Sequence, residues 1–111
     1  MTEQNIFLQQ LLHILDEGHA TGITVIDVRQ QTSVTDYMII CSAKSSRQVR
    51  AIAENVVQHM KHQGLLALSQ HGIAEGEWAL IDFADFVVHI MQPATRDFYN
   101  LEELWQSHPA P

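Results

Sequence analysis

The chain has 111 residues, of which 46% are hydrophobic and 17% are charged, a balance typical of a folded globular domain. That length suits one domain, so we expect residues 1–111 to fold as a unit. Thirteen acidic and six basic residues give a net charge of −7. This charge argues against direct nucleic-acid binding, because phosphates are neutralised by clustered lysine and arginine.

The number of cysteines and the hydropathy of the sequence indicate the cellular compartment in which the protein is expected. Cys41 is the only cysteine, which excludes an intrachain disulfide and suits a reducing environment. The sequence has no apolar run near the roughly 20 residues of a membrane span, and residues 1–10 lack the basic start of a signal peptide. We therefore expect a cytoplasmic protein with no membrane partner.

An amphipathic helix is predicted over residues 2–17, where apolar side chains recur at steps of three and four and Gly18 marks the end. Thr2 is a candidate N-cap for this helix. Strands are predicted over residues 23–29 and 34–42. The middle of the second strand is apolar on both faces, which favours a position inside a covered sheet.

A second helix is predicted after Ser45, which forms a capping-box pattern with Gln48 and precedes a long apolar stripe. Gly64 ends this helix, and a short strand is predicted over residues 65–69. The strand–helix–strand step predicts a crossover that joins parallel strands.

Two further strands, residues 77–83 and 85–91, form a predicted hairpin, and residues 95–105 have a helical pattern. We place Phe83 and Ala84 at the centre of the hairpin turn. That register pairs three sets of residues across the hairpin: Asp82 with Asp85, Leu80 with Val87, and Trp78 with His89.

The order of elements predicts an α/β fold. An antiparallel hairpin joined to parallel strands gives a single-domain mixed β-sheet of about five strands, with helices on its faces. One face of the hairpin is wholly apolar and should form core. The other face is mixed and is where chemistry or a partner could act; it carries Trp78, Leu80, Asp82, Asp85, Val87 and His89.

Asp82 and Asp85 allow a metal-dependent interpretation. With His89, and with Asp27 or Asp36 from neighbouring strands, they could hold a divalent ion, as in a nucleotidyltransferase or phosphohydrolase. The alternative is that aspartates beside a tight turn bind its backbone N–H groups. We favour the turn and expect no bound metal, because the chain offers no second acidic motif with ligand spacing.

No other polar cluster in the sequence predicts a catalytic or ligand-binding site more strongly than Asp82 and Asp85 do. The loop before the second helix has serines, Lys44 and Arg47, but lacks the glycine that would let the backbone wrap a phosphate. His59 and His62 show no third metal ligand, so we expect surface histidines. Cys41 lies in an apolar strand and should be inert. We expect neither an enzyme nor a cofactor.

Several short segments together resemble the ribosomal silencing factor (Iojap-like) family. The match begins with DYMII at residues 36–40 and SSRQV at 45–49, and continues through the hairpin to the final helix. Each piece is weak alone, but the ordered set covers nearly the whole chain. Its later members are Glu75, Gly76, Trp78, residues 80–82, Asp85, residues 87–89, 96–99, 101–102, Leu104 and Trp105.

This resemblance implies a small α/β domain related in fold to nucleotidyltransferases but without their catalytic motif. It implies binding to the large ribosomal subunit through ribosomal protein fourteen, where the bound factor sterically blocks joining of the small subunit. Translation is thereby repressed under nutrient limitation. The resemblance also implies a homodimer off the ribosome. The competing hypothesis is the metal-dependent enzyme built on Asp82 and Asp85.

The interface residues we predict are aromatic, basic or acidic, because Trp, Tyr and Arg dominate binding hot spots and acidic groups suit a basic ribosomal protein. A core position is the alternative for Trp78, Tyr99 and Trp105. The candidate partner contacts are Glu75, Trp78, Asp82, His89, Arg96 and Tyr99.

The chain departs from the family pattern at two alanines. The family favours glycine where Ala84 and Ala43 stand. If position 84 needs a positive φ, alanine there costs on the order of 1 kcal/mol.

Overall fold

The computed structural model describes the backbone of residues 3–106, so the cap expected at Thr2 lies outside the described residues. The helices and strands in chain order are α1 (Glu3–Glu17), β1 (Thr21–Asp27), β2 (Tyr37–Ser42), α2 (Ser46–His62), β3 (Ser69–His71), β4 (Trp78–Asp82), β5 (Phe86–Met91), α3 (Pro93–Tyr99) and α4 (Leu101–Gln106).

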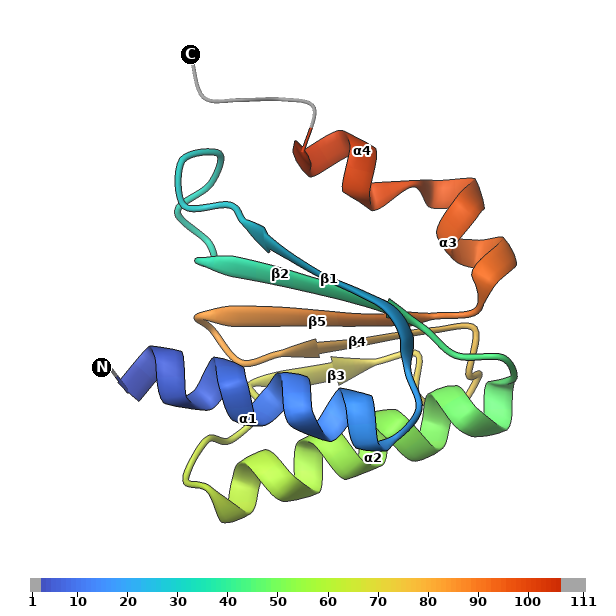
Figure 1. Ribbon diagram of the computed structural model, residues 1–111, viewed down its shortest axis with the longest axis horizontal. Helices are drawn as coiled ribbons and strands as arrows, with labels where there is room; N and C mark the ends of the chain where they lie inside the picture. Colours follow the sequence, from blue (N-terminus) through green and yellow to red (C-terminus); the bar gives the residue numbers. More distant parts are fainter. Residues whose placement is uncertain (1–2, 107–111) are drawn as a thin grey trace.

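The strands form one five-stranded sheet in the order β1-β2-β5-β4-β3. Strands β2 and β5 pair in parallel, and the other three pairs are antiparallel, which confirms the predicted mixed sheet. The crossover through α2 does not join adjacent strands, since β5 and β4 lie between β2 and β3. Helices α1 and α2 lie on one side of the sheet, and α3 and α4 on the other (Figure 1).

The face under α1 and α2, which we call the first face, holds the larger core. Leucines from α1 and the apolar stripe of α2 pack there against alternate residues of the central strands. Cys41 is also in this core, and burial raises the pKa of its thiol to about 12, which confirms an inert cysteine. The largest fully buried side chains include Phe86, Leu11, Leu15, Ile39, Ile52 and Ile81.

The capping box before α2 forms as predicted, with one difference. The Ser45 hydroxyl accepts a hydrogen bond from the Gln48 backbone N–H at 3.2 Å. The Gln48 side chain reaches back to the N–H of Lys44, at 2.7 Å, rather than to that of Ser45. Both contacts satisfy N–H groups at the start of the helix, where the backbone supplies no acceptor.

The predicted hairpin register is wrong by two residues. Trp78 pairs with Met91 and Asp82 with Val87, because Ala84 and Asp85 stand at the turn in place of Phe83 and Ala84. A shift of two preserves the side of every side chain, so the apolar and mixed faces stay as predicted.

Ala84 sets this turn. Its φ is +71°, and the Asp85 N–H donates to the Phe83 carbonyl at 2.9 Å, which together indicate a γ-turn. The Asp82 carboxylate accepts the Ala84 N–H at 2.8 Å, which confirms its turn-fixing role. Alanine therefore occupies a conformation that favours glycine. Ala43, the other departure, has no positive φ.

Two boundaries also differ from the prediction. The strand expected at residues 65–69 lies at Ser69–His71, because Leu65 still donates to the Met60 carbonyl and so completes the end of α2. The helix expected at 95–105 is two helices, divided at Asn100, which has a φ of +47°. Asparagine tolerates this left-handed conformation better than most residues.

Candidate protein-docking site

The face opposite the first face, which we call the second face, is only partly covered. Helices α3 and α4 pack over its β1 and β2 side, where Trp105 and Leu101 join a smaller apolar core. Trp105 is therefore a half-buried core residue, which agrees with the alternative considered for it. Toward β4, the side chains of Leu80 and Val87 stay partly exposed.

Four aromatic rings contact one another in succession across the boundary between α3 and the sheet. The ring centroids are 5.1 Å apart for Phe98 and Tyr99, 4.7 Å for Tyr99 and Trp78, and 5.8 Å for Trp78 and His89. We call these four residues the aromatic row. Its exposure falls from 81% at Phe98 and 52% at Tyr99, through a half-buried Trp78, to 4% at His89.

The inner end of the aromatic row is a hydrogen-bonded pair. The Trp78 indole Nε1–H donates to His89 Nδ1 at 2.9 Å. Burial lowers the pKa of His89 to about 4, so the ring is neutral at pH 7 and keeps an acceptor on Nδ1. Trp78 and His89 thus make contact as predicted, although as diagonal neighbours rather than as a directly opposed pair.

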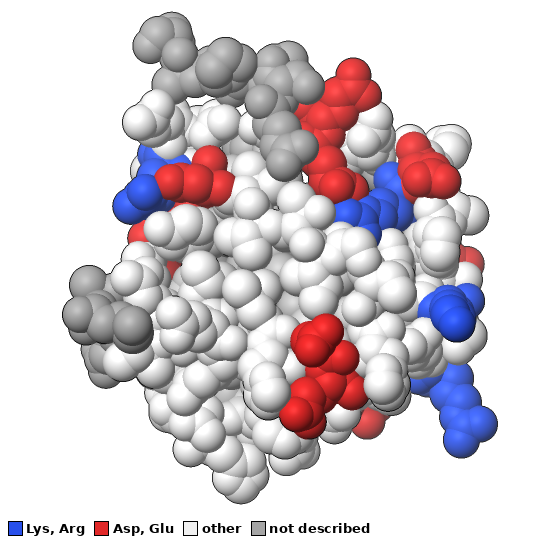
Figure 2. All heavy atoms as spheres, viewed as in Figure 1, with Lys and Arg blue, Asp and Glu red and all other residues white. Residues whose placement is uncertain are grey.

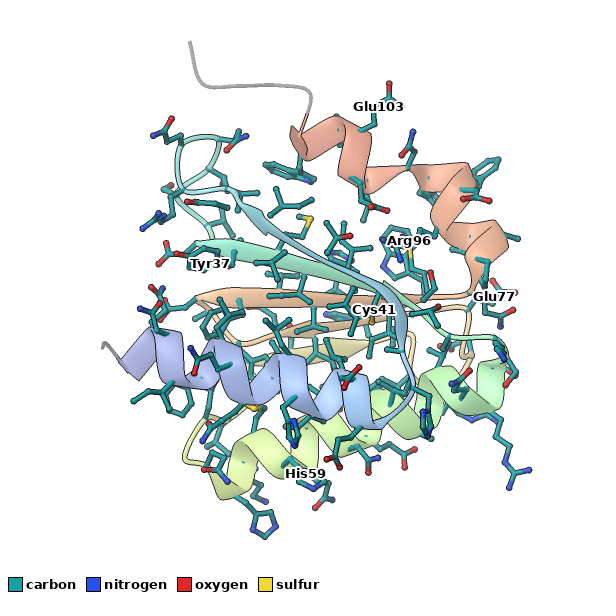
Figure 3. All side chains as sticks on the ribbon, viewed as in Figure 1. Tyr37, Cys41, His59, Glu77, Arg96 and Glu103 are labelled. Atoms are coloured by element: carbon teal, nitrogen blue, oxygen red, sulfur yellow. The ribbon has the colours of Figure 1, made fainter. Side chains whose placement is uncertain are left out.

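Arg96 fixes α3 to the sheet. Its guanidinium donates to Glu102 Oε1 at 2.6 Å, to Ser42 Oγ at 2.9 Å and to the Gly22 carbonyl at 2.8 Å. Its hydrogen bond to Glu102 also lowers the pKa of that carboxyl. The Arg96 side chain is only 13% exposed, so in the free chain it positions the helix that carries Tyr99. Figure 3 shows Arg96 between α3 and the strands.

Exposed acidic side chains lie close in sequence to the residues of the aromatic row. Glu75 and Glu77 are exposed beside the start of β4, and Asp97 and Glu103 are exposed on α3 and α4. Acidic groups stand over α3 and α4 in Figure 2, and Figure 3 labels Glu77 and Glu103. This rim of carboxylates, which we call the acidic rim, gives the site a negative border.

Three of the four carboxylates proposed as metal ligands have other partners. Asp82 binds the turn, Asp27 forms an ion pair with Arg29 at 2.6 Å, and Asp36 accepts from Gln4 at 2.6 Å. In the described part of the chain, no group of three or more His, Cys, Asp or Glu residues is arranged to hold a metal ion. His59 and His62 are exposed on α2, as expected of surface histidines.

The sequence reasoning missed Phe98, the most exposed large hydrophobic residue described. A signal was present, because Phe98 and Tyr99 are adjacent in a short helix. Adjacent helical residues point about 100° apart, so both rings could not face the sheet. One aromatic ring had to lie toward solvent.

Comparisons with known proteins identify the family. The family model described as ribosomal silencing factor during starvation matches residues 2–111. The chain is 41% identical, over 95 residues, to the ribosomal silencing factor of Haemophilus influenzae, a match that covers 86% of this chain and 93% of the relative. This chain belongs to the ribosomal silencing factor family.

Two further relatives extend the comparison. A crystal structure of a protein from Chromobacterium violaceum matches with a TM-score of 0.91 and 33% identity, over 100% of this chain and 92% of that one. Over 101 residues the chain is 33% identical to the mouse protein named mitochondrial assembly of ribosomal large subunit protein 1, covering 88% of this chain and 44% of that relative. Among the described residues, no helix of this silencing factor domain is long and apolar enough to cross a membrane.

Proposed function

We propose that this chain binds the large ribosomal subunit through ribosomal protein fourteen and blocks joining of the small subunit. Translation is thereby repressed when nutrients are limiting. Membership of the ribosomal silencing factor family supports this function, and the name of the mouse relative refers to the large ribosomal subunit. A cytoplasmic location, where bacterial ribosomes work, is part of the proposal.

The aromatic row is the observation that carries the proposal. Phe98 is 81% exposed and Tyr99 is 52% exposed; the Phe98 ring contacts Tyr99, and Tyr99 contacts the half-buried Trp78. Exposing two large aromatic rings beside each other forgoes burial that is worth about 1.5–3 kcal/mol for a Phe side chain. Such a patch marks a protein-binding surface, where Trp and Tyr supply the largest contributions.

The acidic rim suits a basic partner. Glu75, Glu77, Asp97 and Glu103 would meet a positively charged surface and speed its approach more than they would tighten the complex. Asp82 and His89 also stay in the proposed site, as residues that fix the turn and the aromatic row. Arg96 stays there as the residue that fixes α3 to the sheet.

The proposed mechanism is steric and requires no turnover. The described domain measures 40 × 34 × 21 Å. If its second face docks on the large subunit, the sheet and the α1–α2 layer project away from that surface, where they would obstruct an approaching small subunit. Such an action needs no nucleophile, metal or cofactor.

Sedimentation of purified ribosomal subunits tests the proposed function. We expect the added protein to migrate with the large subunit and to reduce the fraction of joined ribosomes. Reconstitution with ribosomal protein fourteen alone should reproduce the binding. Unchanged subunit joining together with no co-migration would reject the function.

We further propose that the free protein forms a homodimer. The partly covered second face gives a second copy apolar surface to bury, and the same surface would be released when the ribosome is bound. Light scattering over a range of concentrations tests this. A molar mass that stays monomeric up to high concentration would rule it out.

A further inference from the structure

We propose that His89 is a positioning residue for docking: its Nδ1 atom holds the Trp78 indole in the orientation that presents the aromatic row to the partner. This inference rests on the proposed function and adds a specific role for a buried side chain. His89 itself is 4% exposed, so it acts through Trp78 rather than by touching the partner.

The first support is geometric. The indole N–H of Trp78 meets His89 Nδ1 at 2.9 Å, and Trp78 also packs against Tyr99 with ring centroids 4.7 Å apart. The hydrogen bond and the ring contact together restrict the plane of a side chain that is otherwise only half-buried. A fixed plane saves part of the side-chain entropy that would be lost on binding.

The second support is the state of the imidazole. Nδ1 accepts the hydrogen bond from the Trp78 indole N–H, so the proton of the neutral ring lies on Nε2. Nε2 is buried, and among the described residues it has no hydrogen-bond partner. The low pKa of His89 keeps the ring neutral throughout the physiological range, and the hydrogen bond from Trp78 selects this tautomer.

The unpartnered Nε2 indicates that His89 does more than fill space in the core. A buried donor without an acceptor costs about 1–3 kcal/mol, and a leucine would fill the site without that cost. The useful atom of His89 is therefore Nδ1, whose one contact is with an interface residue. A residue that only filled the core would not require that atom.

Two substitutions remove the hydrogen bond from opposite sides. His89→Leu removes the acceptor, and Trp78→Phe removes the donor while keeping an aromatic ring beside Tyr99. We expect each to weaken binding to the large subunit by roughly tenfold, the upper part of the cost of ordering one side chain on binding. We expect the double variant to bind no more weakly than either single variant, because one shared contact is lost.

A spectroscopic readout tests the contact in the free chain. In a ¹⁵N-labelled sample, the indole N–H resonance of Trp78 should move upfield in His89→Leu, with the resonance of Trp105 as internal reference. Backbone amide spectra show whether the fold is kept, and Trp78→Phe provides the binding test if His89→Leu does not fold.

Three results would overturn the proposal: an unmoved Trp78 resonance, wild-type affinity in Trp78→Phe, or losses that simply add in the double variant. Failure of the proposed function is recognised separately, because then the unaltered protein does not bind the large subunit at all. The resonance test still applies in that case, since it needs no partner.

Discussion

The two faces of the sheet are built from the same strands but are used differently. On the first face, α1 and α2 bury every strand residue of the central core, and Ile81 and Val88 are 0% exposed. On the second face, two short helices cover one side and leave the aromatic row at their border. The first face holds the larger core and should account for most of the stability of the domain, whereas the second leaves apolar surface that a partner could cover.

Substitution in the first face should give the largest loss of stability. Phe86 is 1% exposed and stacks on Tyr37 with ring centroids 6.1 Å apart. Phe86→Ala should lower the free energy of unfolding by about 3–5 kcal/mol, the range for a buried Phe replaced by Ala. Urea titration measures the change. A loss below about 1 kcal/mol would contradict the assignment of this face as the main core.

Acidification should weaken the second face through His89. Its pKa is about 4 in the folded chain against an ordinary value of 6.5, so the unfolded state binds the extra proton between these pH values. Stability should therefore fall as the pH drops through this window, by about 3 kcal/mol in total. His89→Leu should flatten that part of the curve of unfolding free energy against pH. An unchanged curve would show that His89 does not cause it.

Loss of the Arg96 contacts should weaken the packing of α3 against the sheet. Arg96→Met keeps much of the aliphatic stem but removes the hydrogen bonds to Glu102, Ser42 and Gly22. We expect a loss of about 2 kcal/mol, the scale of charge-assisted bonds. Hydrogen exchange should rise first in α3 and α4. Uniform exchange across the whole sheet would instead indicate that α3 does not open separately.

The smallest effect should come from the hairpin turn. Ala84→Gly relieves a φ of +71° and should stabilise the domain by about 1 kcal/mol, without touching either face. A midpoint shift in thermal unfolding reports it. Gly64 gives the matched control, because it also has a positive φ and has open space where a Cβ would stand: Gly64→Ala should destabilise the domain by a similar amount.

Sequence patterns predicted the side of the sheet on which each side chain lies better than they predicted which residues pair across the hairpin. Alternation in residues 77–91 assigned every hairpin side chain to the correct side, because that depends only on a period of two. The turn could not be placed from the pattern, because its position depends on the γ-turn at Ala84. The division at Asn100 was missed for a similar reason, since one left-handed residue decides it.

The candidate site was predicted in part. Trp78, His89 and Tyr99 came together as the sequence suggested, but Arg96 binds groups on β1 and β2 that are more than 50 positions away in the chain. Long-range contacts of this kind leave no local pattern. Phe98 was missed because a helical aromatic residue is usually assigned to a core.

The most direct test compares two exposed apolar side chains, Phe98 in the aromatic row and Leu68 in the loop before β3. They are 81% and 70% exposed, so replacing either with alanine should change the unfolding free energy by less than about 0.5 kcal/mol. The measurement is the dissociation constant for purified large ribosomal subunits. Phe98→Ala should weaken binding by at least about 2 kcal/mol, while Leu68→Ala should bind as the unaltered chain does. Equal affinities for the two variants would contradict a docking role for the second face.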